Sequence, residues 1–173
     1  ITTGIVTNTN DAGIGSLRYE VTNATSGATI TIDPSLAGLT TILTSGVITF
    51  GEDMTIVGAD GYEVSGNYAS RIFSLSATET VSISNMIMSN GAAGGFNSGG
   101  AIDQAGTLTL TDCTLLGNVG FNGGAIRVQS GAALNLTRCT FSNNSTNGNS
   151  GGAIINSGDV IATNCTFSGN AAT

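Results

Sequence analysis

The sequence contains no Trp, no His and no Lys, and it has a single Pro. Its only basic residues are Arg18, Arg71, Arg127 and Arg138. Without His or Lys, few side chains remain that could act as a base near neutral pH. The net charge of −7 argues against a nucleic-acid partner, because phosphate binding requires a basic face. No apolar run approaches the roughly 18 residues of a transmembrane helix, so we expect no transmembrane segment.

Cysteine is also scarce, and its three copies, Cys113, Cys139 and Cys165, are spaced 26 residues apart. Three cysteines do not make a disulfide framework, so we expect them to be small buried apolar fillers. One disulfide with one free thiol is the alternative. We expect no metal site and no cofactor, because neither His nor a second Cys cluster accompanies these thiols.

What the chain does contain is Gly, with 26 residues, and a 40% share of hydrophobic residues, which together indicate a folded chain with many turns. From residue 99 to residue 170 one pattern occurs three times. Each copy has a Gly-Gly-Ala-Ile tetrapeptide, an alternating apolar stretch, a Cys, and an Asn shortly after it. The glycine pairs are Gly99-Gly100, Gly123-Gly124 and Gly151-Gly152, and the Asn residues are Asn118, Asn144 and Asn170. A fixed period in this range is typical of a solenoid.

Apolar residues alternate with polar ones inside each copy, as in Leu108 and Leu110, which is the periodicity of a strand. Helical spacing is absent. We therefore predict an all-β fold, a single-stranded right-handed parallel β-helix of about six or seven coils. Coils in such a fold stack about 4.8 Å apart, so that residues one period apart lie above one another.

This stacking predicts inward-facing ladders of equivalent side chains. They are Ile102/Ile126/Ile154, Leu108/Leu134/Val160, Cys113/Cys139/Cys165 and Leu115/Phe141/Phe167. Asn118, Asn144 and Asn170 are predicted to form a corner ladder, because a stacked amide can donate to the next coil and accept from the previous one. The Gly-Gly pairs are expected at tight turns that need positive φ and no Cβ.

The N-terminal part departs from the regular repeat. Ser16 is a candidate N-cap for a short helix containing Leu17, Arg18 and Val21, which would cover the open end of the stack. We interpret residues 1–173 as one domain, with a cap and irregular coils in 1–70 and regular coils in 71–173. Loops are predicted at 91–98 and 145–150. No C-terminal cap follows Asn170, so we expect either that the native chain continues or that this end meets another molecule.

The repeat of Gly-Gly-Ala-Ile with Phe-x-x-Asn resembles the repeats of chlamydial polymorphic outer-membrane proteins and related bacterial β-helix surface proteins. Leu115 replaces the Phe in the first copy. The front half, with Gly15-Ser16-Leu17-Arg18 and Ser70-Arg71-Ile72-Phe73, resembles a companion segment of large bacterial extracellular β-helix proteins. The resemblance implies this fold and an extracellular or cell-surface location. It says little about activity, since members serve as adhesins, passengers and structural stalks.

Catalysis is the first function to weigh, because many parallel β-helices cleave acidic polysaccharides with clustered carboxylates. Here Asp103, Asp112 and Asp159 fall on separate coils at different offsets. Asp112 lies one coil from Arg138, which predicts a cross-coil ion pair worth about 0–1 kcal/mol at a surface. We therefore expect no catalytic residues.

Two binding functions are weaker candidates. Loops rich in Asn and Asp, such as residues 8–11, could hold calcium, but Asx turns explain them more simply. The Thr107-x-Thr109-x-Thr111 stretch could suggest an ice-binding face. Because only Thr111, Thr137 and Thr163 persist as a ladder, we interpret these residues as strand formers on a solvent face.

Two hypotheses remain. The favoured one is an exported, non-catalytic structural subunit that assembles head to tail into an extracellular filament or surface structure, because a non-closing contact propagates. The alternative is part of a cell-surface adhesin or passenger domain whose loops at 91–98 and 145–150 bind a glycan or a receptor. A polysaccharide lyase-like enzyme is a distant third.

Overall fold

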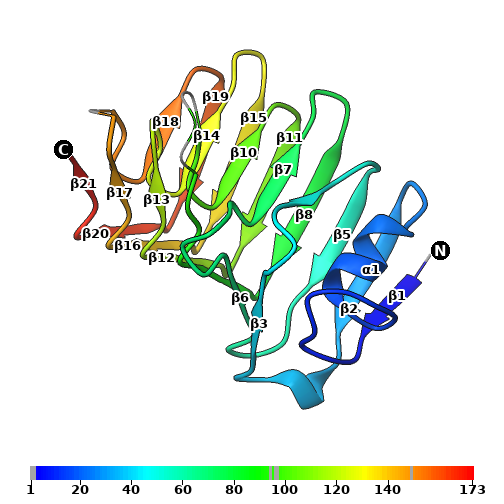
Figure 1. The fold of residues 1–173 in the computed structure, drawn as a ribbon. Coiled ribbons are helices and arrows are strands. Elements are labelled where there is room, and N and C mark those ends of the chain that lie inside the picture. The colour runs from blue at the N-terminus through cyan, green and yellow to red at the C-terminus, as the bar shows by residue number, and fades with distance from the viewer. Residues whose placement is uncertain (1–2, 94, 96–97, 149) are drawn as a thin grey trace.

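The computed structural model describes residues 3–93, 95, 98–148 and 150–173, and over these residues the chain winds into a parallel β-solenoid of about six turns (Figure 1). The predicted all-β parallel β-helix is therefore confirmed. The seven-stranded sheet runs along the whole solenoid. Its strands, in spatial order, are β1 (Thr3–Val6), β2 (Ala28–Ile32), β5 (Met54–Val57), β8 (Thr80–Ser84), β11 (Thr107–Thr111), β15 (Ala133–Thr137) and β19 (Asp159–Thr163).

Three shorter sheets form the other sides of the coil. The six-stranded sheet contains β3 (Thr40–Ile42), β6 (Glu63–Ser65), β9 (Ile87–Ser89), β12 (Thr114–Leu116), β16 (Thr140–Ser142) and β20 (Thr166–Ser168). The five-stranded sheet contains β4 (Ile48–Thr49), β7 (Phe73–Leu75), β10 (Ile102–Gln104), β14 (Ile126–Val128) and β18 (Ile154–Asn156). The three-stranded sheet contains β13 (Val119–Gly120), β17 (Ser145–Thr146) and β21 (Ala171–Ala172).

The strand register places residues one period apart directly opposite each other. Leu136 of β15 pairs with Leu110 on one side and with Ala162 on the other. Alternate side chains point inward, so Leu110 and Leu136 are at most 1% exposed. The buried apolar side chains form one continuous core that follows the solenoid axis.

The corner between the seven-stranded and six-stranded sheets is made by a row of residues with positive φ. They are Asn85 (52°), Asp112 (54°), Arg138 (52°) and Asn164 (55°). Left-handed backbone is rare outside Gly, and Asn and Asp tolerate it best. Asp112 and Arg138 also form the predicted cross-coil ion pair, at 2.7 Å, although both side chains are about half exposed. This pair therefore contributes little beyond the corner itself.

The Gly-Gly pairs have no room for a Cβ, as predicted, but most of them do not have the predicted positive φ. Of these six residues only Gly151 has positive φ, so the expected left-handed turn is wrong for Gly99, Gly100, Gly123, Gly124 and Gly152. These glycines lie where neighbouring coils approach closely. A Cβ on Gly124 would lie 1.9 Å from the carbonyl oxygen of Gly152, which is impossible without moving a coil. Close backbone approach thus explains the pairs.

The N-terminal end is covered by helix α1 (Leu17–Thr22), which packs against β1, β2 and β4 (Figure 1). The Ser16 hydroxyl caps it by accepting a hydrogen bond from the Tyr19 N–H at 3.2 Å, and Leu17 and Val21 are buried. The 3₁₀ turn η1 (Pro34–Leu36) follows β2. No helix in the described part of the chain is both long and apolar enough to cross a membrane.

Arg18 fastens this cap to the second coil. Its guanidinium donates to the carboxylate of Asp11 at 2.7 Å and to the carbonyl oxygens of Gly46 and Val47 at 2.6 and 2.9 Å. Burial tends to raise the pKa of Asp11, but hydrogen bonds from Ser45, Arg18 and Thr44 outweigh it and lower the pKa to about 2. The ion pair of Asp11 with Arg18, which holds the cap in place, therefore stays ionised at neutral pH.

Replacing Gly124 by Ala should destabilise the solenoid, because the new methyl group would collide with the Gly152 carbonyl. We expect the free energy of unfolding in urea to fall by at least about 2 kcal/mol. Gly51→Ala is the matched control, since no atom lies within 4 Å of its Cβ and its φ is not positive. Equal stabilities for the two variants would contradict the close approach of the coils.

Candidate interaction surfaces

The Asn ladder is the most ordered polar feature of the solenoid. Asn118 accepts a hydrogen bond from the Gly91 N–H at 2.7 Å and donates through Nδ2 to the Met88 carbonyl at 3.1 Å. The same Nδ2 donates to Oδ1 of Asn144 at 2.9 Å, and that oxygen also accepts from the Asn118 N–H at 3.0 Å. Asn118 and Asn144 are fully buried. Each amide thus links its own coil to both neighbours.

The ladder ends at Asn170 on the last coil. Its Oδ1 accepts from the N–H and Nδ2 of Asn144 at 3.0 and 2.9 Å, and its Nδ2 donates to the Phe141 carbonyl at 2.9 Å. Asn118 and Asn144 each donate two hydrogen bonds to the following coil, one from the backbone N–H and one from Nδ2. The same two donor groups of Asn170 have no such acceptor within the described residues. The last coil therefore presents two unused donors in a geometry already fixed by the coils behind it.

The apolar ladders reach the same end face. The rings of Phe141 and Phe167 are stacked, with centroids 4.8 Å apart and planes at 9°. Phe141 is fully buried, whereas Phe167 is 49% exposed because no ring covers its other side. Leu115 lies opposite Phe141 on the preceding coil, and Ile102, Ile126 and Ile154 line up in the five-stranded sheet. We call the exposed surface of β18, β19, β20 and β21 the C-terminal face.

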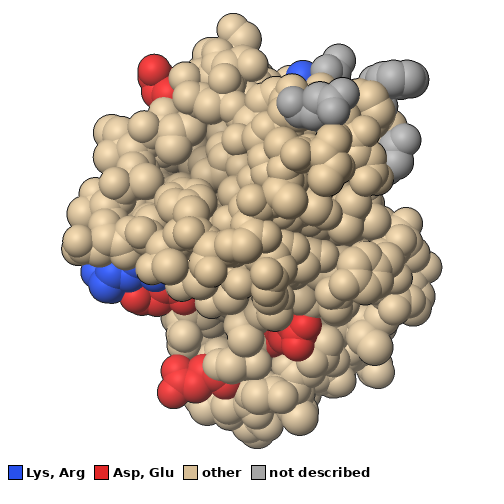
Figure 2. Space-filling model, turned by 90° about the vertical axis from the view of Figure 1, so that its left-hand side faces the viewer, with Lys and Arg blue, Asp and Glu red and all other residues tan. Residues whose placement is uncertain are grey.

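The C-terminal face carries little charge. Figure 2 looks onto this end of the molecule, and uncharged side chains cover most of it, with a few acidic and basic groups at the left and below the centre. The opposite end differs, because α1 closes it. The predicted loop at 145–150 begins as strand β17, which corrects that prediction, while residues 94, 96, 97 and 149 of the two predicted loops lie outside the described part of the chain.

Cys113, Cys139 and Cys165 form a row, each directly after a corner residue with positive φ. Cys113 and Cys139 are buried, Cys165 is partly buried, and all three are free thiols. The Sγ atoms of Cys113 and Cys139 lie 3.6 and 3.4 Å from the carbonyl oxygens of Ile83 and Leu110 on the preceding coils. A hydrogen bond to Cys139, together with burial, raises the pKa of Cys113, so its thiol stays protonated at neutral pH.

Every Arg of the sequence lies beside an Asp. Arg18 pairs with Asp11 and Arg138 with Asp112, both at 2.7 Å, while Arg71 and Arg127 share Asp103 at 3.5 Å each. Asp103 also accepts from Nε2 of Gln129 at 2.9 Å. Sequence spacing paired Arg138 with Asp112 but missed the Asp103 cluster, because only the register of β10 with β14 brings Asp103 opposite Arg127.

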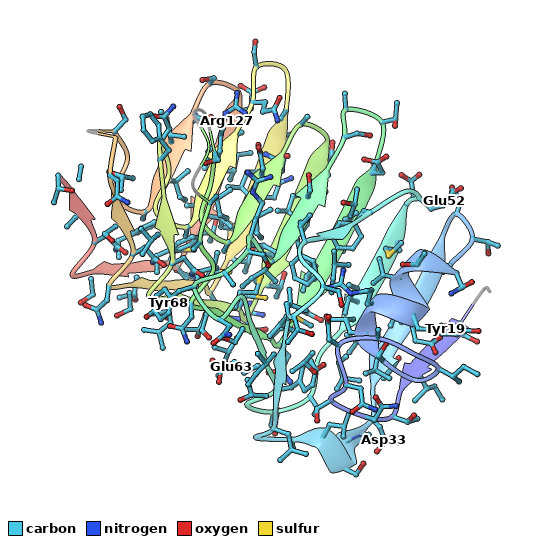
Figure 3. All side chains as sticks on the ribbon, in the orientation of Figure 1. Tyr19, Asp33, Glu52, Glu63, Tyr68 and Arg127 are labelled. Carbon is cyan, nitrogen blue, oxygen red and sulfur yellow. The ribbon has the colours of Figure 1, made fainter. Side chains whose placement is uncertain are left out.

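Glu52, Asp53 and Glu79 line one small surface hollow, where Asp53 already accepts a hydrogen bond from the Thr80 N–H at 2.7 Å and Glu79 accepts one from the Ser76 hydroxyl at 2.6 Å. Glu52, Glu63 and Arg127 come from well-separated parts of the solenoid (Figure 3). No three His, Cys, Asp or Glu side chains of the described residues gather closely enough to hold a metal ion.

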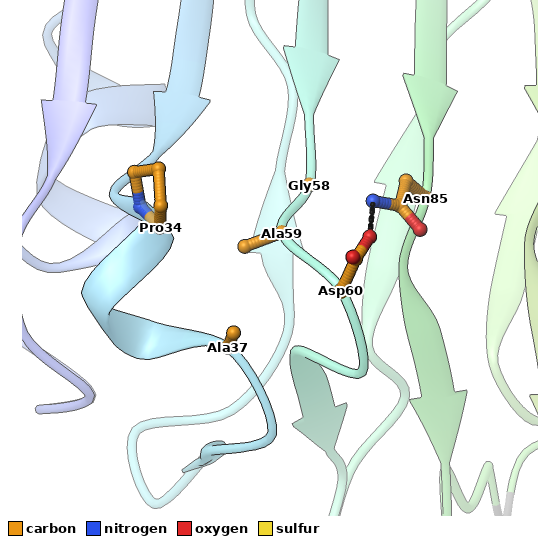
Figure 4. A pocket seen from close by; sticks show the side chains of 6 residues that line it. All are labelled: Pro34, Ala37, Gly58, Ala59, Asp60 and Asn85. Atoms are coloured by element: carbon orange, nitrogen blue, oxygen red, sulfur yellow. Dashed lines mark hydrogen bonds between the residues drawn. The ribbon is translucent and has the colours of Figure 1, made fainter.

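A surface hollow of about 380 Å³ lies between η1 and the ends of β5 and β8 (Figure 4). Its walls are Pro34, Ala37, Gly58, Ala59, Asp60 and Asn85. Asp60 is the one titratable residue among them, and its carboxylate already accepts from Nδ2 of Asn85 at 3.0 Å. A single engaged carboxylate provides no acid–base pair.

One buried polar residue is unexplained by sequence. Gln104 is fully buried and points into the core, opposite Leu75 and Val128, and both polar atoms of its side chain lack a hydrogen-bond partner. The alternation of β10 could have placed it inward, but Ile126 and Val128 on the next coil gave no reason to expect an amide there.

Comparison of the chain with protein-family models, curated proteins and solved structures finds no significant match.

Replacing Asn144 by Ala should destabilise the fold strongly, because the Asn118 amide groups and the Leu115 carbonyl would lose their partners. We expect a loss of about 3–5 kcal/mol in the free energy of unfolding, at 1–3 kcal/mol for each orphaned buried group. Asn135→Ala, on the outer side of β15, should change it by less than about 0.5 kcal/mol. Similar losses for both variants would show that the ladder does not hold the coils together.

Proposed function

We propose that this protein is a non-catalytic structural β-solenoid of an extracellular or cell-surface assembly, which associates end to end through its C-terminal face. The observation that carries the proposal is the continuity of the ladders, in which the Asn amides and the Phe rings each contact the equivalent residue of the next coil. A second copy of the chain could continue both. The likeness of the repeats to bacterial surface proteins supports the location.

The charge pattern supports the non-catalytic part. All four Arg residues are paired with Asp, Arg71 and Arg127 sharing Asp103, and His and Lys are absent. The polar side chains of the interior hold the coils to each other through the Asn ladder. Side chains committed to structural contacts in this way favour a scaffold over a reactive site.

The two ends differ, which favours a particular mode of association. Helix α1 covers the core at the N-terminal end, but β1 is an edge strand of the seven-stranded sheet, and β19 is the opposite edge. Both run parallel to all strands between them, so β19 of one copy could pair with β1 of the next and continue the sheet. Such a head-to-tail contact does not close and produces a filament.

Phe167→Arg should weaken this association. Covering the exposed half of the ring contributes about 2 kcal/mol at 25 cal/mol per Å², and a buried guanidinium would have to be desolvated. We therefore expect association at least about tenfold weaker in sedimentation velocity across a concentration series. Ile161→Arg is the matched control, because Ile161 lies in the same last coil, on β19, but on the outer side of the seven-stranded sheet, where it is 64% exposed.

Three results would contradict the proposal. The first is a wild-type protein that stays monomeric at high concentration. The second is an equal effect of both Arg substitutions. The third is cleavage of a polyuronate by the wild-type protein, which would overturn the non-catalytic part. Receptor or glycan binding that survives Phe167→Arg, without self-association, would favour the adhesin instead.

A further inference from the structure

The outer side of the seven-stranded sheet carries two straight rows of side chains that only the strand register reveals, beside a shorter third row of Thr80, Thr107, Ala133 and Asp159. The first row is Thr3, Thr29, Thr55, Ser82, Thr109, Asn135 and Ile161, and the second is Ile5, Thr31, Val57, Ser84, Thr111, Thr137 and Thr163. Ten of these 14 positions are Thr or Ser, three are Ile or Val, and one is Asn. We call this surface the hydroxyl face.

The hydroxyl face is much longer than the sequence suggested. The ladder of Thr111, Thr137 and Thr163 is visible in the regular repeats alone, and it was interpreted as simple strand propensity. The register now extends it through β8, β5, β2 and β1, where spacing shifts between 26 and 27 residues hide it in the sequence. The rows therefore span all seven strands.

The hydroxyl groups on this face are free to bind something outside the protein. Among the described residues, Ser84 is the one member of the two rows whose hydroxyl makes a hydrogen bond within the chain, to the Ile56 carbonyl at 3.5 Å. The six-stranded sheet differs, because Thr40 and Ser89 there are both bonded to the carboxylate of Glu63. No position in the two rows is charged.

The spacing of the rows is fixed by the backbone. Equivalent hydroxyls lie about 4.8 Å apart between strands and about 6.7 Å apart along a strand, two residues on. Because every inner strand is hydrogen-bonded on both sides, this rectangular grid is rigid. Water oxygens on the prism faces of ice repeat on a rectangular grid of similar dimensions. Each Thr presents both a hydroxyl that can bond to water and a methyl group that leaves neighbouring water to order itself.

We propose that the hydroxyl face binds ice. Its chemistry disfavours other occupants, since it has no charge to complement an ionic partner and no aromatic ring to stack on a sugar. It is about 30 Å long and two residues wide. That area, a few hundred Å², falls below the roughly 800 Å² per partner of a stable protein interface. An ice surface can instead meet every hydroxyl of the grid at once.

This activity is independent of end-to-end association, because the hydroxyl face lies along the side of the solenoid. Association would lengthen the two rows without altering them. The failure of either proposal therefore leaves the other to be judged on its own experiment.

The test uses the intact 173-residue chain and a slowly growing ice hemisphere. We expect the wild-type protein to be enriched in the ice, to inhibit ice recrystallisation and to shape ice crystals below the melting point. Thr109→Lys, at the centre of the array, should reduce enrichment to that of an unrelated soluble protein. Thr140→Lys is the matched control, because it places the same charge on the outer side of β16 in the six-stranded sheet, and it should retain wild-type enrichment.

Circular dichroism must show wild-type β-structure and melting temperature for both variants. If Thr109→Lys fails this check, Thr31→Lys in the second row takes its place with the same expected loss. Exclusion of the wild-type protein from ice would overturn the proposal, and so would equal enrichment of the hydroxyl-face variant and the control. Retention of the wild-type protein on insoluble cellulose or chitin without enrichment in ice would also overturn it.

Discussion

Parallel pairing between residues one period apart is the constraint on which the rest of this structure depends. Once β11, β15 and β19 lie in register, every side chain of one coil has an equivalent above and below it. A residue that is favourable in one coil is then favourable in contact with its own copies. Stacked amides form the Asn ladder, and stacked rings form the Phe141–Phe167 pair. The glycines lie in a line where the backbones of neighbouring coils approach closely.

The same constraint gives the three regions of the surface their different chemistry. The side formed by the seven-stranded sheet shows two uncharged rows rich in hydroxyls beside a shorter row that ends in Asp159, while Arg71 and Arg127 lie around Asp103 of the five-stranded sheet. The C-terminal face exposes the ends of the ladders, whereas α1 closes the N-terminal end. A protein whose interior is occupied by contacts between coils can bind only through its sides and its ends, which is where both proposals place binding.

Sequence periodicity predicted the solenoid and the strands from residue 99 onward, because there the repeat is regular enough to align by eye. It could not predict that close approach between coils leaves the Gly-Gly pairs no room for a Cβ, since that approach depends on distances that spacing does not contain. It also missed the partners of Asp103, which follow from the 24-residue register of β10 with β14, and the length of the hydroxyl face, which follows from the register of N-terminal strands such as β1 and β2. Gln104 had no signal, because its burial without a partner follows no rule of composition or spacing.

The most direct test of the stacked arrangement is a nuclear Overhauser experiment on isotope-labelled protein. The account predicts backbone cross-peaks between strands at sequence separations of 26 or 27 residues, with Leu136 connected both to Leu110 and to Ala162. It also predicts contacts between the side-chain amides of Asn118 and Asn144. Cross-peaks dominated by antiparallel hairpin neighbours, with none at this period, would contradict the solenoid and both functions inferred from it.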